Sequence, residues 1–197
     1  MSQKVPSHWE NPIDQFLLSN FVEPVGPLLY KFHFTPDMIT TIGVIFRIFS
    51  LYSLFNNNKL NFLIGAVISY FFDCLDGHYA RKYNMCTKFG DYYDHFSDIV
   101  YHSILAYYLL YISNFSKSPY SCIISIIIIG LILLMFINSG CQESFYKYNT
   151  TYYSPTCYSP TLSIFKNWCQ NVEHLAITRF FGSGTVLLLI YLLIYFV

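Results

Sequence analysis

Charged residues are scarce in this chain. Of its 197 residues only 11% are charged, whereas 54% are hydrophobic and 20% are aromatic. Soluble globular domains usually contain about 25% charged residues. So few charges could not cover a surface that faces water, so we expect one domain whose surface faces mainly lipid or other helices.

Three further absences concern the possible partners of the protein, its targeting and its cysteine chemistry. The net charge is zero, so no electrostatic reason favours nucleic acid as a partner. No cleavable signal peptide is recognisable at the N-terminus, because the first long apolar run begins only near Met38. The cysteines show neither a CxxC pair nor zinc-ligand spacing, and we interpret them as small buried hydrophobic residues rather than a disulfide framework. They are Cys74, Cys86, Cys122, Cys141, Cys157 and Cys169.

What the chain has instead is long apolar runs. Five of them are close to the ~20 residues that an α-helix needs to cross a bilayer. They cover residues 38–55, 60–81, 88–112, 120–137 and 175–197, and no internal repeat relates them. Residues 143–171 are polar and rich in tyrosine and contain Pro155 and Pro160, so we expect a loop or an interfacial segment there. The pattern predicts an all-α, polytopic membrane bundle.

An N-terminal arm, residues 1–34, precedes the membrane domain, residues 35–197. Its apolar part is interrupted by Pro24, Gly26 and Pro27, which makes it unsuited to span a bilayer. We expect an amphipathic helix that lies in the membrane interface. A soluble arm is the alternative.

The placement of lysine and arginine orients the spans. If the N-terminus is cytosolic, the outer side receives only Lys59 and Lys117, and Arg47 lies inside the first span. The inner side then collects Lys4, Lys31, Arg81, Lys82, Lys88, Lys147, Lys166 and Arg179. Under the positive-inside rule the turn between the second and third spans is therefore cytosolic. We expect an integral protein of the endoplasmic reticulum in a eukaryote, or of the inner membrane in a bacterium.

Acidic residues gather around that turn. Five of the eleven acidic residues in the chain are Asp73, Asp76, Asp91, Asp94 and Asp98. A carboxylate inside a membrane helix costs roughly 2.5–3.5 kcal/mol, so four of them would cost on the order of 10 kcal/mol if nothing compensated their charge. Arg81 and Lys82 are too few to neutralise them all, whereas divalent cations could.

The spacing places these residues on two helical stripes. One stripe contains Asp73, Asp76, Gly77, Ala80 and Arg81, and the other contains Gly90, Asp94 and Asp98. Two helices joined by a short turn would face these stripes toward each other. Clustered carboxylates suit Mg²⁺ or Mn²⁺ rather than zinc. The glycines allow a ligand or a neighbouring helix to approach closely, and the arginine could hold a phosphate.

The residues read D-x2-D-G-x2-A-R-x8-G-x3-D-x3-D, and over about residues 35–140 the chain resembles the CDP-alcohol phosphatidyltransferase family. The resemblance implies that two metal ions are held at the donor pyrophosphate by Asp73, Asp76 and Asp94. It implies that Asp98 is the base for the acceptor hydroxyl. It also implies nucleotide contacts from Asp73, Gly77, Ala80 and Arg81, with Gly90 allowing helix packing or substrate approach. Family members commonly have six spans, so we expect five to six transmembrane helices. We also expect a homodimer.

Other polar residues carry weaker signals. Asp91 could touch the cluster, and we expect His78 and His95 to pack beside it rather than bind metal. Arg47 needs a partner, which could be the aspartates or a substrate phosphate. The chain departs from the family at Asp37, where many members have asparagine after the proline that opens the first span. His8, His33, His102 and His174 carry no signal.

The substrate is less well defined. The stretch DGHYARKYNMCTKFG looks most like phosphatidylinositol synthases, which implies a CDP-diacylglycerol donor, an inositol-like acceptor and release of CMP. Asp94-His95 and the sequence TPDMIT are similar instead to choline and ethanolamine phosphotransferases, which use a CDP-amino-alcohol and diacylglycerol. A non-catalytic membrane protein that binds cations is a remote alternative.

Overall fold

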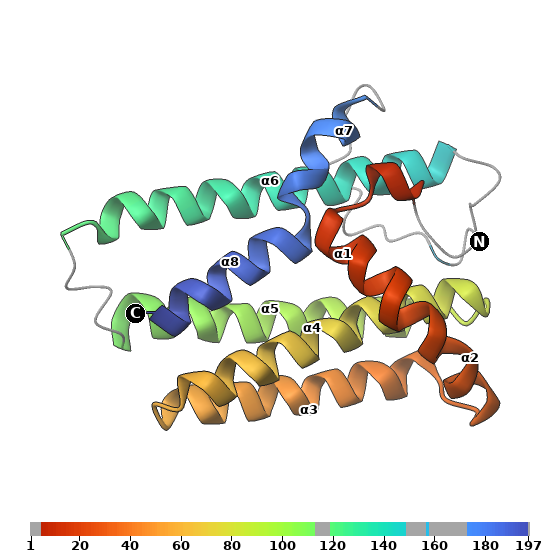
Figure 1. Ribbon diagram of the computed structural model, residues 1–197, viewed down its shortest axis with the longest axis horizontal. Helices are drawn as coiled ribbons and strands as arrows, with labels where there is room; N and C mark the ends of the chain where they lie inside the picture. The colour runs from red at the N-terminus through yellow and green to blue at the C-terminus, as the bar shows by residue number, and fades with distance from the viewer. Residues whose placement is uncertain (1–4, 113–118, 149–156, 158–172, 197) are drawn as a thin grey trace.

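The computed structural model describes residues 5–112, 119–148, 157 and 173–196, and the regular elements in these ranges are all helical, which confirms the all-α prediction. Figure 1 shows α3, α4, α5 and α6 extending along the length of the molecule while α1 runs across it. The α-helices are α1 Pro12–Leu17, α2 Glu23–Lys31, α3 Pro36–Phe55, α4 Lys59–Lys82, α5 Lys88–Tyr107, α6 Ser121–Tyr148, α7 His174–Thr178 and α8 Ser183–Phe196. Two π-helical turns, Leu18–Val22 and Tyr108–Ile112, join α1 to α2 and extend α5.

Short turns connect α3, α4 and α5, and a side-chain cap begins each of these helices. The motif lies on α4 and α5. The Thr35 side chain accepts a hydrogen bond from the first turn of α3, and Asn58 and Thr87 do the same for α4 and α5. Asn57 and Asn84 adopt positive φ angles of 58° and 54° in the two turns, a conformation that asparagine tolerates better than most residues. The C-terminal half of α4 is thereby brought beside the N-terminal half of α5.

Four of the described helical segments are long and apolar enough to cross a membrane. They cover Pro36–Phe55, Lys59–Lys82, Ser121–Tyr146 and His174–Phe196. The remaining predicted span coincides with α5, which carries Asp91, Asp94 and Asp98 among its first eleven residues and is correspondingly less apolar.

The predicted loop or interfacial segment from residue 143 is wrong at its start, because α6 continues without interruption to Tyr148. Glu143 is fully buried, and Asn138 and Tyr146 are each only 2% exposed. A polar stretch can remain helical inside a protein when its side chains find partners there, and this long-range condition is not visible in local sequence. Residues 149–156 and 158–172 lie outside the described part of the chain.

The N-terminal arm shares a core with the bundle. Leu18 and Val22 pack in one buried cluster with Ile39 of α3 and with Leu75 and Tyr79 of α4. A second cluster joins α3, α4, α5 and α8 at the opposite end of the bundle, through residues such as Leu54, Phe62, Tyr101 and Ile194. The arm thus contacts α4, the helix that carries Asp73 and Asp76.

The interpretation of all six cysteines as buried hydrophobic residues is wrong. Cys86 and Cys157 form a disulfide with a Cα–Cα distance of 5.1 Å, across a sequence separation of 71 residues. Cys141 is also disulfide-bonded. Of the cysteines that the structure describes, Cys74 and Cys122 are free. Pairing between positions so distant in sequence depends on the fold, so spacing alone could not reveal it.

Candidate active site

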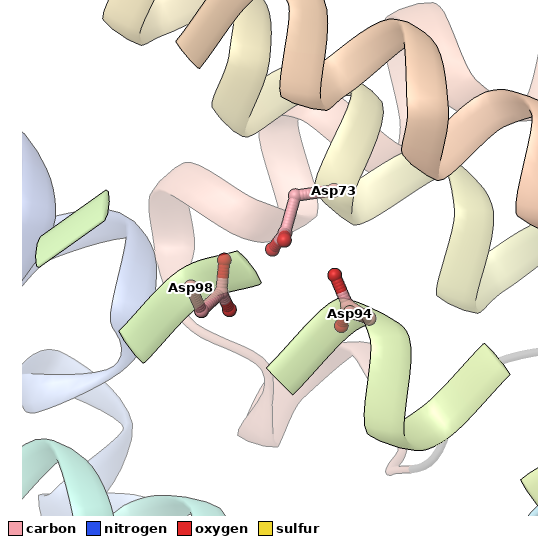
Figure 2. Close-up of side chains that lie close together, drawn as sticks. All are labelled: Asp73, Asp94 and Asp98. Carbon is pink, nitrogen blue, oxygen red and sulfur yellow. The ribbon is translucent and has the colours of Figure 1, made fainter. Parts of the chain in front are cut away.

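Two helices bring three carboxylates together. Asp73 projects from α4, and Asp94 and Asp98 project from successive turns of α5, so that the three side chains converge in the space between the helices (Figure 2). One oxygen from each lies within 4.8 Å of the others. All three side chains are partly buried, with 24–34% of their surface exposed. We refer to Asp73, Asp94 and Asp98 as the carboxylate triad.

Asp76, which the sequence groups with the metal ligands, lies outside this triad. Its Oδ2 atom accepts a hydrogen bond of 2.5 Å from the Thr40 hydroxyl of α3, and only 5% of its surface is exposed. Thr40 was not singled out from the sequence. The available signal was a polar side chain inside an otherwise apolar span, four residues after Pro36.

Arg47 of α3 supplies a positive charge at the triad. Its Nη2 atom lies 2.6 Å from Asp73 Oδ1, 2.5 Å from Asp98 Oδ1 and 4.0 Å from Asp94 Oδ1. Its Nη1 atom donates a hydrogen bond to Ser97, whose hydroxyl in turn bonds the carbonyl of Asp94. The sequence left two partners open for Arg47, the aspartates or a substrate phosphate. In the structure Arg47 contacts the aspartates.

A cavity of about 560 Å³ lies beside the triad, toward the α4–α5 turn. Asp76 and Asp94 line it, whereas Asp73 and Asp98 are not among its lining residues. Of the four positions predicted to contact nucleotide, Gly77, Ala80 and Arg81 line the cavity and Asp73 does not. Gly90, predicted to allow substrate approach, also lines it. Both cysteines of the Cys86–Cys157 disulfide also contribute to its wall.

Close approaches explain the two glycines of the motif. A Cβ atom at Gly77 would lie 3.3 Å from Arg81 Nη1, because the guanidinium folds back over this position. A Cβ atom at Gly90 would lie 2.9 Å from Asp37 Oδ1 and 3.1 Å from Thr87 Oγ1. A larger residue at position 90 would therefore displace Asp37, the residue at which the chain departs from the family pattern.

The neighbouring histidines have separate contacts. His95 Nδ1 lies 2.6 Å from the Asp91 carbonyl oxygen and 3.7 Å from its carboxylate, and both residues line the cavity. His78 is buried at 1% exposure. His102, which carried no signal in the sequence, bonds through Nδ1 to the Asp98 carbonyl at 2.8 Å and lies 3.3 Å from Tyr191 through Nε2.

The donor set of the triad fits a divalent metal ion. Asp94 Oδ1 is buried and has no hydrogen-bond partner within the described part of the chain. A buried carboxylate oxygen without a donor is costly unless a cation meets it. Oxygen ligands of this kind are those that Mg²⁺ and Mn²⁺ prefer.

Comparisons with known proteins identify the family of the chain. The sequence model of the CDP-alcohol phosphatidyltransferase family matches residues 33–195. An archaetidylinositol phosphate synthase of Pyrococcus horikoshii is 30% identical over 73 residues, an alignment that covers 37% of this chain and 39% of that relative. No solved structure matches. The family match thus covers more of the chain than residues 35–140, over which the sequence resemblance was described. The chain belongs to the CDP-alcohol phosphatidyltransferase family.

Proposed function

We propose that the protein transfers a phosphatidyl group from CDP-diacylglycerol to a hydroxyl of a small, inositol-like alcohol and releases CMP. The observation that carries this proposal is the convergence of Asp73, Asp94 and Asp98 beside a cavity lined by Gly77, Ala80 and Arg81, three of the four nucleotide-contact positions of the family motif. Family membership supports the type of reaction. The name of the similar Pyrococcus protein contains inositol phosphate, which favours a polyol acceptor over an amino-alcohol.

The donor nucleotide would occupy the cavity of about 560 Å³. Arg81 offers a planar guanidinium suited to phosphate oxygens, and the neighbouring Gly77 and Ala80 keep the helix surface low enough for a nucleotide to lie against it. Asp73 joins Gly77, Ala80 and Arg81 as the fourth nucleotide-contact position, from the triad side of the same helix. The α4 surface therefore holds the part of the donor that leaves as CMP.

Asp73, Asp76 and Asp94 would hold two metal ions, Mg²⁺ or Mn²⁺. When bound, such ions neutralise the charge of the pyrophosphate and stabilise the departing phosphate oxygen. The chain's own part is to fix the ligands: Thr40 orients the Asp76 carboxylate, and Arg47 orients Asp73. Asp94 Oδ1 lies 4.0 Å from Arg47 but accepts no hydrogen bond from the described residues, so a metal ion could still meet this oxygen.

Asp98 would be the general base. It takes the proton from the acceptor hydroxyl as that oxygen forms its bond to the phosphatidyl phosphorus, and the bond from phosphorus to the CMP oxygen breaks. Its side chain is the most exposed of the triad, at 34%, which suits a group that must meet a second substrate. A positioned carboxylate base contributes about 10²–10⁴-fold to such a reaction.

Several broader predictions belong to the same proposal. Residues 1–34 would lie in the membrane interface, residues 35–197 would form the transmembrane catalytic domain, and the protein would be a homodimer. The active site would open to the cytosol of a cell in which CDP-activated donors are made.

A CMP-release assay tests the proposed activity. Purified protein in lipid nanodiscs is given CDP-diacylglycerol with inositol, inositol phosphate, glycerol phosphate or serine, and in parallel diacylglycerol with CDP-choline or CDP-ethanolamine. We expect CMP only with CDP-diacylglycerol and a polyol acceptor. CMP from the CDP-amino-alcohols would instead establish the choline and ethanolamine type, and no CMP from any pair would contradict the proposal.

A further inference from the structure

Arg47 is a buried cation held against the carboxylates of the candidate active site. Only 6% of its surface is exposed. One guanidinium nitrogen, Nη2, contacts both Asp73 and Asp98, at 2.6 Å and 2.5 Å, while the other reaches Ser97. The residue lies in the apolar helix α3, one of the four described segments suited to cross a membrane. An arginine at such depth is costly unless opposite charges surround it.

Asp73, which Arg47 contacts, and Asp94, whose Oδ1 atom lies 4.0 Å from it, are also proposed ligands of a metal ion. A metal ion held by Asp73 and Asp94 would therefore lie close to the guanidinium of Arg47. Two cations at that separation repel each other strongly in a site with little water. Arg47 and a divalent ion therefore compete for the negative charge of the triad.

We propose that Arg47 is the resident counter-ion of the carboxylate triad, a positioning residue that keeps Asp73 and Asp98 in place and weakens divalent-metal binding in the absence of substrate. The pyrophosphate of a nucleotide donor adds negative charge beside the triad and offsets the repulsion. Metal and donor consequently bind firmly only together. This inference rests on the proposed metal site and adds to it a residue that controls when the metal binds.

Manganese binding without nucleotide tests the inference. Wild-type protein, Arg47→Met and Arg47→Lys are compared in nanodiscs by the electron paramagnetic resonance signal of free Mn²⁺. The Met variant keeps an unbranched side chain of similar length without the charge, and the Lys variant keeps the charge. We expect Arg47→Met to lower the apparent Kd for Mn²⁺ about tenfold or more, and Arg47→Lys to stay within about threefold of wild type.

A second measurement keeps the inference testable if Arg47→Met folds poorly. The melting temperature of each protein is recorded with and without Mn²⁺, and we expect the metal to raise it more in Arg47→Met than in wild type, because the metal then replaces the missing charge. Asp73→Asn is the control that should abolish binding in either background.

The outcomes separate the inference from the proposed function. If wild type binds Mn²⁺ and Arg47→Met binds it equally or more weakly, with no larger rise in melting temperature, Arg47 is not a competitor and the inference is overturned while the metal site stands. If Arg47→Met binds Mn²⁺ and wild type does not, the inference is supported in its strongest form. If neither binds, and Mn²⁺ stabilises neither, both the metal site and the inference fail.

Discussion

Thr40 of α3 and Asp76 of α4 form a buried hydrogen bond of 2.5 Å between hydroxyl and carboxylate. The bond fixes one Asp76 oxygen to a neighbouring helix, whereas the triad carboxylates are joined through Arg47. The four aspartates of the motif are thus supported by two different side chains of α3. The four aspartates can therefore be tested by separate substitutions.

Replacing the aspartates one at a time should divide them into two groups. Asp73→Asn, Asp76→Asn and Asp94→Asn each remove a proposed metal ligand, so we expect weaker metal-dependent binding of CDP-diacylglycerol. Asp98→Asn should leave donor binding nearly intact and lower turnover by about 10²-fold or more. Equilibrium donor binding and CMP release measure the two effects. Equal loss of donor binding in all four variants contradicts the assignment of Asp98 as base.

Activity should require a divalent cation. The triad and Asp76 offer only hard oxygen ligands, so Mg²⁺ or Mn²⁺ should restore CMP release after chelation, and Zn²⁺ should restore it poorly. The assay is run in EDTA and then with a measured excess of each ion. Full turnover in EDTA would remove metal from the mechanism.

A methyl group at Gly184 should loosen the N-terminal arm. A Cβ atom there would clash with Asp14 Oδ1 and lie 3.0 Å from its Cγ atom, because the arm packs closely on the start of α8. We expect Gly184→Ala to destabilise the protein by about 1–3 kcal/mol, measured by thermal unfolding in detergent. Gly130→Ala is the matched control, since among the described residues no atom beyond its own stretch of helix backbone lies within 4 Å of its Cβ position, and it should be neutral or slightly stabilising. Equal melting temperatures for the two variants would show that the arm is not held there.

Asp14 should make stability depend on pH. Burial raises its pKa from 3.8 to about 6, although hydrogen bonds from Tyr70 and the Gly184 amide act in the opposite direction. The folded protein therefore binds this proton more tightly than the unfolded chain does. The contribution of Asp14 is most favourable below pH 4 and is lost as the pH rises toward 7, by roughly 3 kcal/mol in total.

Asp14→Asn isolates this effect from the other carboxylates. The amide still accepts the hydrogen bond of the Tyr70 hydroxyl but does not ionise. We expect the variant and wild type to be similarly stable at pH 4, and the variant to be more stable at pH 7, in denaturation curves recorded at both values. A wild type that is the more stable of the two at pH 7 would show that the ionised carboxylate is compensated.

Topology can be tested by labelling. Eight of the eleven lysines and arginines fall on one side if the N-terminus is cytosolic, so Lys82 should be cytosolic and Asn57 should lie opposite. Single cysteines at these positions, in a background without native cysteines, are exposed to an impermeant thiol reagent on sealed vesicles of known orientation. Labelling of position 57 but not 82 from the cytosolic side inverts the prediction.

The Cys86–Cys157 disulfide makes this experiment more informative. Cys86 is four residues from Lys82, and disulfides persist mainly in oxidising compartments and are rare in the cytosol. The charge distribution and the disulfide therefore favour opposite locations for the same end of the bundle. Inverted labelling would place the site with the disulfide in an oxidising compartment, where a CDP-activated donor would have to be delivered.

The local sequence contained enough to predict the main helices and the convergence of three of the four motif aspartates, whereas Asp76 bonds Thr40 instead. Helical spacing alone places Asp94 and Asp98 on one stripe that can face Asp73, and the structure brings these three together. Arg47 was recognisable as a residue in need of a partner, because an arginine in an apolar span is unstable alone.

Contacts between distant segments could not be predicted in this way. Glu143 lies in a polar stretch that reads as a loop, yet it is buried in α6. Asp14 lies in the arm that the sequence predicts to be interfacial, yet it accepts a hydrogen bond from Tyr70, 56 residues away. Each depends on which helices meet, and neither local propensity nor periodicity specifies that pairing.

The disulfide also changes how the chain is connected. By linking Cys86 to Cys157 it closes a covalent ring that contains α5, α6, Asp94 and Asp98. A single break in the backbone anywhere within that ring leaves one molecule, with the two aspartates of α4 still bonded to the two of α5 through an unbroken path. Where the break lies between Cys86 and Asp98, reduction of the disulfide would then divide the motif between two fragments.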